Sequence, residues 1–138
     1  MQLNVKPIDL IVLHNNTFYV CVEGVYIKGG KILLLKRSVE PFKGCWHLAG
    51  GHVEETETLK EALKREFEEE TSLDIDVGNI IDGRIEETFD RTKIIVTLEV
   101  ASARGEIIIN SESEDFGWFA QTPANSVHDY AKYLKKRR

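Results

Sequence analysis

The sequence is poor in cysteine, in proline and in long apolar runs. Its 138 residues include two cysteines and three prolines. Cys21 and Cys45 are too few for a disulfide framework and lack metal-ligand spacing, which predicts reduced thiols and a cytoplasmic location. No apolar run approaches the ~20 residues that span a bilayer, and residues 1–17 do not have the layout of a signal peptide. A secreted protein or a membrane protein is therefore not expected.

Positive charge is also scarce. The sequence has eighteen basic and twenty-three acidic side chains. The resulting net charge of -5 disfavours nucleic-acid polymers and acidic membranes as partners. The sequence has no internal repeat and no linker-like stretch, which predicts a single domain over residues 1–138, with 1–17 as an N-terminal extension or an extra strand. An acidic domain that handles phosphates must neutralise them locally, with a metal ion or with a few placed cations.

Strands dominate the predicted secondary structure. The alternating run 19–27 and the run 31–36 flank Gly29-Gly30 and read as a hairpin. Further strands are predicted over residues 80–89, 93–102, 106–109 and 116–119. One helix is predicted over about residues 57–71, capped by Thr56 or Thr58. A second helix is predicted after Pro123, ending in the cationic residues 135–138.

The first predicted helix places acidic residues where a core-facing stripe is expected. At 100° per residue, one apolar stripe is formed by Leu59, Ala62, Leu63 and Phe67. Three glutamates continue this stripe: Glu66, Glu69 and Glu70. A glutamate-rich helix is usually a solvated face, but that interpretation fits only the other charged residues, Lys60, Glu61, Lys64 and Glu68. Because clustered inward carboxylates repel one another and lose hydration, they need a cation, and Mg²⁺ is the simplest choice beside phosphate.

Residues 51–73, GHVEETETLKEALKREFEEETSL, resemble the Nudix box of the MutT-like Nudix hydrolases. The flanking segments FKGCWHLAGG and EDFGWF resemble the same family, so the resemblance covers roughly residues 18–137. Three positions depart from the family pattern: Ala49 replaces a common proline, and Thr56 and Ser72 replace glycines. A left-handed conformation at Ser72 would cost a serine about 1 kcal/mol more than a glycine, so Ser72→Gly is expected to stabilise the protein.

The resemblance implies an α/β fold, the Nudix α/β/α sandwich, with a mixed β-sheet between the box helix and a C-terminal helix. It also implies Mg²⁺-dependent or Mn²⁺-dependent hydrolysis of a phosphoanhydride bond in a nucleoside diphosphate linked to another moiety. Candidate substrates are ADP-ribose, a nucleotide sugar and an oxidised or normal nucleoside triphosphate. Residues 88–91 lack the proline or tyrosine by which subfamilies differ, so the substrate stays open. The alternative function is an inactive nucleotide-binding sensor module, and either form could be a homodimer.

Candidate site residues follow from the match, position by position. The implied metal ligands are the Gly50 carbonyl and the carboxylates of Glu66, Glu69 and Glu70. Glu69 is favoured as general base, with Glu112 and Glu114 as alternatives beside the other two helix glutamates. Arg65 is expected to orient these carboxylates and to pair with Glu57.

Candidate substrate contacts lie outside the helix and are predicted less sharply. Arg37 could clamp a phosphate, Trp46 could stack a base, and Glu114 could reach the substrate. A solvated strand end for Arg37 and core packing for Trp46 are the alternatives. The four histidines form no ligand pattern, and of these only His52 is expected to be placed to touch a substrate.

Overall fold

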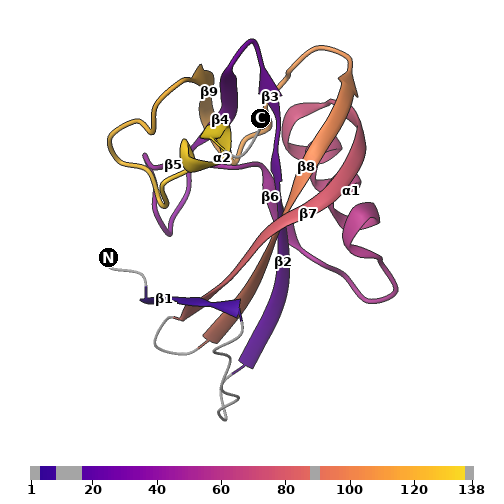
Figure 1. The fold of residues 1–138 in the computed structure, drawn as a ribbon, viewed down its shortest axis with the longest axis vertical. Coiled ribbons are helices and arrows are strands. Elements are labelled where there is room, and N and C mark those ends of the chain that lie inside the picture. Colours follow the sequence, from indigo (N-terminus) through magenta and orange to yellow (C-terminus); the bar gives the residue numbers. More distant parts are fainter. Residues whose placement is uncertain (1–3, 9–16, 88–90, 136–138) are drawn as a thin grey trace.

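The computed structural model describes residues 4–8, 17–87 and 91–135, in which a long helix packs against a strongly twisted sheet (Figure 1). In chain order the elements are β1 (Asn4–Pro7), β2 (Thr17–Val25), β3 (Ile27–Lys28), β4 (Lys31–Arg37), β5 (Trp46–His47), β6 (Gly50–His52), α1 (Leu59–Thr71), β7 (Asp74–Glu87), β8 (Arg91–Arg104), β9 (Ser113–Phe119) and α2 (Lys132–Lys135). No helix in these ranges is long and apolar enough to cross a membrane.

The strands form two sheets. The larger sheet has the order β1-β7-β8-β2-β6, in which β2 and β8 run parallel and the other neighbours antiparallel. The smaller sheet contains β3, β4 and β5, with β9 paired to β4. In Figure 1, α1 lies on one side of the larger sheet, and the smaller sheet with α2 lies on the other. The predicted α/β fold class with a mixed sheet is confirmed, although the strands are divided between two sheets.

The predicted hairpin is only partly correct. β3 and β4 pair antiparallel around Gly29 and Gly30, whose positive φ angles of 60° and 75° suit a tight two-residue turn. However, β2 ends at Val25 and joins β8 and β6 in the larger sheet. The sequence pattern missed this transfer because residues on both sides of it have the same apolar, β-branched character.

α1 begins at a capping box and covers one face of the larger sheet. Thr58 accepts a hydrogen bond from the Glu61 amide, and the Glu61 carboxylate accepts one from the Thr58 amide. The apolar stripe of the helix then packs into the main core with residues from β2 and β8. This core includes Leu63, Phe67, Val22, Leu98 and Val100, all nearly inaccessible. The predicted helix, its Thr58 cap and its inward stripe are therefore present.

In the C-terminal third, one prediction is wrong and another is only partly correct. Residues 106–109 form no strand, because the Ile108 amide donates to the Thr71 carbonyl and the Ile108 carbonyl accepts from Ser72 Oγ. The predicted C-terminal helix is a single turn, Lys132–Lys135, and residues 136–138 lie outside the described ranges. The chain before this turn packs Tyr130, and the turn itself packs Tyr133, into a second core beside β4. At the other end of the chain, β1 is an extra strand on β7, one of the two alternatives predicted for residues 1–17.

Two of the three departures from the Nudix pattern have left-handed backbones. Thr56 has φ 71° and Ser72 has φ 66°, where the family has glycine. Thr56 is exposed, and its side chain makes no hydrogen bond to the described residues. Ser72 Oγ, in contrast, donates to the Ile108 carbonyl at 3.0 Å. The two positions therefore share a backbone strain that only Ser72 offsets.

We expect Thr56→Gly to raise the free energy of unfolding by up to about 1 kcal/mol, because a β-branched residue is strained at positive φ. Ser72→Gly should change it by less, since the lost hydrogen bond, worth about 1 kcal/mol, cancels the relief of strain. Urea unfolding of both variants measures the difference. Equal gains at the two positions would mean that the Ser72 bond contributes nothing.

Candidate active site

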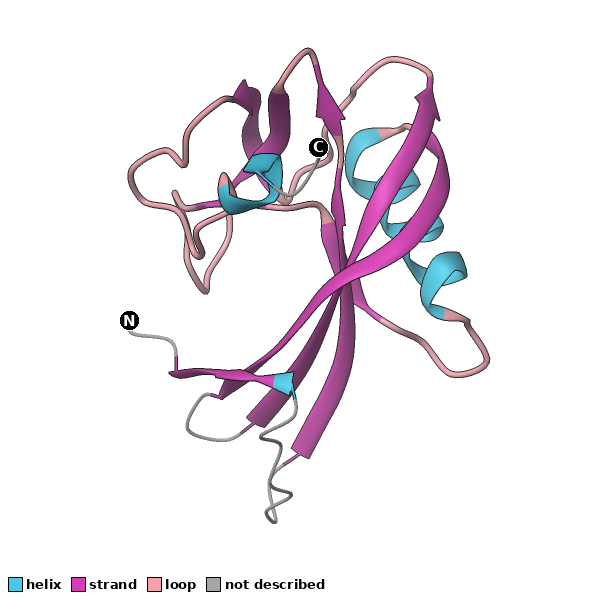
Figure 2. Cartoon of the chain, viewed as in Figure 1, coloured by secondary structure: helices cyan, strands magenta, loops and turns pink. Residues whose placement is uncertain are grey.

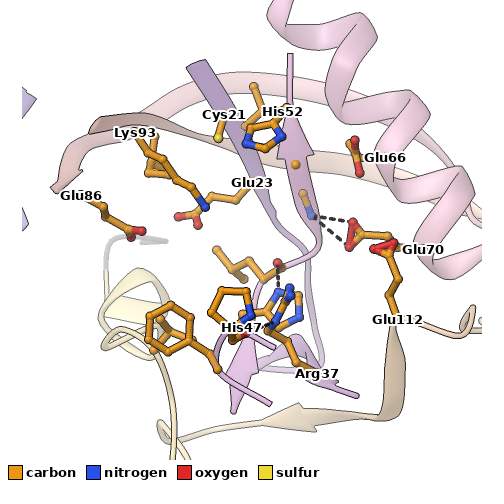
Figure 3. A pocket seen from close by; sticks show the side chains of 18 of the residues that line it. Cys21, Glu23, Arg37, His47, His52, Glu66, Glu70, Glu86, Lys93 and Glu112 are labelled. Carbon is orange, nitrogen blue, oxygen red and sulfur yellow. Dashed lines mark hydrogen bonds between the residues drawn. The ribbon is translucent and has the colours of Figure 1, made fainter. Parts of the chain in front are cut away.

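A cavity of about 590 Å³ lies between the two sheets and extends past the edge strand β6 to α1 (Figure 3). Its floor is one face of the larger sheet, its far end is α1, and the segment around β5 supplies another wall. Alternation along the strands explains the floor, since the residues between those of the apolar core point to the opposite face. The floor side chains come from β2, β7 and β8 and include Cys21, Glu23, Arg84, Glu86, Lys93 and Ile95.

At the helix end, two carboxylates are packed behind the glycines of β6. The Glu66 side chain is 14% exposed, and Glu70 is 8% exposed. The Gly50 amide points to Glu70, with its nitrogen 3.3 Å from Oε2. A Cβ on Gly51 would lie 2.6 Å from the Glu66 carboxylate. Gly51 therefore has to lack a side chain for Glu66 to occupy this position.

These buried carboxylates are poorly suited to carry charge unaided. Burial raises the pKa of Glu70 well above its usual value, and the neighbouring Glu66 carboxylate raises it further. Burial also raises the pKa of Glu66, although its contacts with Arg65 and Glu70 oppose this shift. In the described part of the chain, no basic side chain forms an ion pair with Glu70. A hard divalent cation fits this pair, because it would compensate both charges with the oxygen ligands it prefers.

The third helix glutamate is less buried than predicted. Glu69 is 55% exposed and lies at the rim of the cavity, yet it lines the same cavity as Glu66 and Glu70. Within the described ranges, no three carboxylate, imidazole or thiol groups converge closely enough to surround an ion. Glu68, one residue earlier, faces away from the cavity. The predicted division of the helix into two charged faces is thus observed, with Glu69 at their boundary.

Arg65 connects the helix to the preceding loop. Its Nε and Nη2 donate to the two oxygens of Glu57 at 2.7 and 2.9 Å, and Nη2 also donates to the His52 carbonyl. Its Nη1 donates to Glu66 at 2.9 Å and, more weakly, to Glu69 at 3.3 Å. The hydrogen bonds from Arg65 hold the pKa of Glu57 at about 2. The predicted ion pair is present, and the same guanidinium also holds Glu66.

The two candidate general bases near β9, Glu112 and Glu114, differ in whether they line the cavity. Glu112 lines the cavity, lies near Glu70 in Figure 3 and contributes to the raised pKa of that group. Glu114 is exposed on β9 and does not line the cavity. Of the two residues named as alternatives for the general base, only Glu112 is placed to approach the substrate.

Of the two candidate substrate residues around β5, Arg37 lines the cavity and Trp46 does not. Arg37 lines the cavity, but its Nε donates to the Pro41 carbonyl at 2.7 Å, so it also shapes the adjoining loop. Trp46 packs edge-on against Phe119, with ring centroids 4.8 Å apart, and is a core residue outside the cavity lining. Phe42 lines the cavity instead.

Two histidines line the cavity, although only His52 was expected to. His47 Nδ1 lies 2.7 Å from the Leu48 carbonyl, to which it must donate, while its Nε2 is buried with no partner in the described structure. Burial lowers the pKa of His47 to about 4, so the ring is neutral at pH 7.

The floor holds a charged network that the sequence analysis did not identify. Glu23 and Arg84, 7% and 6% exposed, form a bidentate ion pair with N–O distances of 2.6 and 3.1 Å. Thr97 also donates to Glu23, and Arg84 Nε donates to Glu86 at 2.9 Å. The available signal was charge at alternate positions of two strands, at 82, 84 and 86 and at 91 and 93, together with the single charge of Glu23 in an apolar strand. Charged residues at such spacing on strands that are otherwise apolar indicate a polar cavity floor.

A buried glutamate pair on a helix, at one end of a cavity above a mixed sheet, is an arrangement suited to hold a divalent cation. The NUDIX domain model matches residues 18–136. The chain therefore belongs to the NUDIX domain family, and the resemblance to MutT-like Nudix hydrolases is confirmed.

Named relatives agree with this assignment. A nucleoside triphosphatase NudI of Escherichia coli is 37% identical, with 63% of this chain and 68% of that protein covered. An ADP-ribose pyrophosphatase of Methanocaldococcus jannaschii is 56% identical over 54 residues, which are 39% of this chain and 32% of that protein. The crystal structure of a MutT NUDIX hydrolase from Burkholderia pseudomallei superimposes with a TM-score of 0.75 and 26% identity, covering 88% of this chain and 99% of that one.

Proposed function

We propose that this chain is an Mg²⁺-dependent hydrolase that cleaves a phosphoanhydride bond in a nucleoside diphosphate derivative. The observation that carries the proposal is the buried pair Glu66 and Glu70, which shares a cavity with Glu69 and Glu112. Four acidic side chains at one end of a cavity would repel a diphosphate unless a cation intervened. The same groups are suited to hold that cation and to accept a proton from water.

In this proposal, different residues of the cavity would bind the metal ion, accept the proton and orient the carboxylates. Glu66, Glu69 and Glu70, with the Gly50 carbonyl, would hold the metal ion, which supplies charge neutralisation and Lewis-acid activation when bound. Glu69, the most exposed of the three, would take the proton of a water whose oxygen attacks phosphorus while the bridging P–O bond breaks. Arg65 would keep Glu66 and Glu69 oriented through its hydrogen bonds.

Two substrate classes have support from the relatives' names, ADP-ribose and nucleoside triphosphates. The nucleotide sugars and oxidised triphosphates considered above are chemically similar and stay within the proposal. The sensor alternative is disfavoured, because a binding module without turnover has no need to keep three glutamates at one end of the cavity. A cytoplasmic location is part of the proposal and rests on the sequence, whereas the option of a homodimer rests only on the resemblance to the family.

The test is a panel of ADP-ribose, UDP-glucose, and normal and 8-oxo nucleoside triphosphates, assayed for released phosphate or monophosphate. Turnover is expected with Mg²⁺ or Mn²⁺ and is expected to stop in excess chelator or with Ca²⁺ alone, because Ca²⁺ is larger and less strict in geometry. Full turnover in chelator would exclude the metal-dependent mechanism. Binding of these compounds without any turnover would favour the sensor module.

A further inference from the structure

Glu112 reaches the acidic end of the cavity from a loop and not from α1. The loop connects β8 to β9, and Figure 3 shows the Glu112 side chain directed toward Glu70. Glu112 is exposed, and its carboxylate makes no hydrogen bond or ion pair with the described residues. A long side chain on a loop samples many positions unless its backbone is fixed. The contacts that place this carboxylate must therefore act on the backbone of Glu112.

A β-bulge ends the regular pairing of β9 close to Glu112. Arg37 lies across from Ser113 and not from Glu114, because the register of β4 and β9 shifts by one residue after Lys36. Glu114 is thus the extra residue of a bulge, a device that changes the direction of neighbouring side chains. Because the ladder stops here, the position of Glu112 depends on contacts outside the sheet.

Two hydrogen bonds hold the backbone of Glu112 from different sides. Its amide donates to Asn110 Oδ1 at 3.0 Å, and its carbonyl accepts from the Ser38 amide at 2.9 Å. Ser38, the residue after β4, also donates through Oγ to the Ser111 carbonyl. The backbone of Glu112 is therefore held between the end of β4 and the side chain of Asn110.

Asn110 extends this connection to the helix. Its Nδ2 donates to the Glu69 carbonyl at 3.1 Å, while its Oδ1 accepts from the amide two residues ahead, as in an Asx turn. Asparagine suits this place because it carries a donor and an acceptor on one planar amide group. One side chain thus joins the backbones of Glu69 and Glu112, which both line the acidic end of the cavity.

The simpler interpretation is that Asn110 only completes the end of α1. The Glu69 carbonyl is one of the last four of the helix, which lack partners within it. Ser72 makes a comparable contact at the same helix end by donating to the Ile108 carbonyl. Both residues tie the same loop to α1, but only the contacts of Asn110 include Glu112. A comparison of the two residues therefore separates completion of the helix from placement of Glu112.

We propose that Asn110 is a positioning residue, which fixes the Glu112 carboxylate beside Glu70 by holding the Glu112 amide and the Glu69 carbonyl at once. The inference rests on the proposed function of the cavity, in which Glu112 shares the acidic end with the metal ligands. Because both polar groups of its side chain are bound to backbone, Asn110 acts on the site through Glu112. Its loss should therefore matter only while Glu112 keeps its carboxylate.

A double-mutant cycle with Asn110→Ala and Glu112→Gln tests this dependence. Two quantities would be measured on the full chain: the Kd of Mn²⁺ without substrate, by electron paramagnetic resonance, and kcat with any compound of the proposed panel that is hydrolysed. Asn110→Ala is expected to raise the Kd about tenfold, the low end of the cost of losing a contact behind a metal site. Glu112→Gln should raise it at least as much. In the Glu112→Gln background, Asn110→Ala should add nothing to either quantity.

Ser72→Ala is the matched control, since it removes the comparable bond at the same helix end, and it should change neither the Kd nor kcat. Asn110→Ser should recover part of the affinity, because a hydroxyl can accept from the Glu112 amide in a similar turn. Thermal unfolding in chelator would verify that each variant is folded. An equal loss from Asn110→Ala in both backgrounds, or the same loss in Ser72→Ala, would overturn the inference. An unchanged Kd in Glu112→Gln would do so as well.

The two readouts also separate this inference from the proposed function. Dependence of the Asn110→Ala effect on Glu112 in the Kd of Mn²⁺, without turnover of any compound, would support the role of Asn110 and refute the proposed hydrolase. Independent effects of the two substitutions, with normal turnover in the wild type, would refute the role of Asn110 and leave the proposed hydrolase in place.

Discussion

Glu69→Gln is expected to lower turnover by about two orders of magnitude or more, because it removes the proposed proton acceptor together with one metal ligand. The folded metal-free protein should be unaffected. Glu69 is half exposed, and its hydrogen bonds from Arg65 are long, at 3.3 and 3.4 Å. The free energy of unfolding in chelator should therefore equal that of the wild type or slightly exceed it, since one like charge has gone from the cluster.

Added magnesium should raise the Tm of the wild type more than that of Glu69→Gln. A ligand at ten times its Kd stabilises the state it binds by ~1.4 kcal/mol, which for a domain of this size raises Tm by roughly 3 to 6 °C. The wild type should show this rise in thermal unfolding, and Glu69→Gln should show less of it. A variant that keeps both full turnover and the full rise would remove Glu69 from the proposed metal site.

Glu68→Gln is the matched control for this comparison. Glu68 is the adjacent residue, carries the same charge and is exposed, but lies outside the cavity. The Glu68→Gln substitution should alter neither turnover nor the rise in Tm with magnesium. If the two variants behaved alike, the cavity lining would have no bearing on activity and the helix glutamates would be an ordinary solvated face.

The second large effect is expected from Arg65→Lys, which keeps the charge and loses the geometry. One guanidinium reaches both oxygens of Glu57, the His52 carbonyl and Glu66. A lysine ammonium cannot span these acceptors, so Glu66 and the loop before α1 should shift. Because a displacement of ~1 Å near a reacting centre can cost 10²-fold, we expect a loss of about that size in kcat.

A titration of Glu57 distinguishes the expected local shift in Arg65→Lys from a general loss of folding. In the wild type the hydrogen bonds from Arg65 hold the pKa of Glu57 at about 2, so in Arg65→Lys this pKa should rise toward its usual value of 4.5. NMR of the Glu57 side chain would measure it. Arg104→Lys is the control, since Arg104 also pairs with two carboxylates, Asp74 and Asp76, but on an exposed edge away from the cavity. Unchanged activity in Arg65→Lys would show that its geometry does not matter.

The sequence predicted best where the pattern was local. The position of α1, its Thr58 cap, its buried stripe and the inward Glu66 and Glu70 all follow from residues within a few turns of one another. The left-handed backbone at Ser72 was predicted from a single departure from a motif. These features depend on helix periodicity and capping, which tertiary contacts rarely override.

Features that depend on distant contacts were missed. The transfer of the chain between sheets after Val25 leaves no local signal. The apolar residues around Ile108 predict a strand, because the contacts with Thr71 and Ser72 that hold this segment come from far away in sequence. Trp46 is predicted to stack a base, but its ring packs against Phe119, a contact that no local pattern indicates. The floor network is the largest omission, because it forms only when three separate strands bring together Glu23 of β2, Arg84 and Glu86 of β7, and Thr97 of β8.

The separation of the cavity into two ends also has a consequence for how such enzymes diversify. Apart from Glu112, the helix end is encoded by one continuous stretch, residues 50–70, whereas the floor is encoded by alternate positions in strands spread from residue 21 to residue 97. Substitutions on the floor would therefore alter the lining of the cavity while leaving the proposed metal ligands in place. The proposed metal ligands and the sheet residues that line the rest of the cavity can thus be substituted independently of one another during evolution.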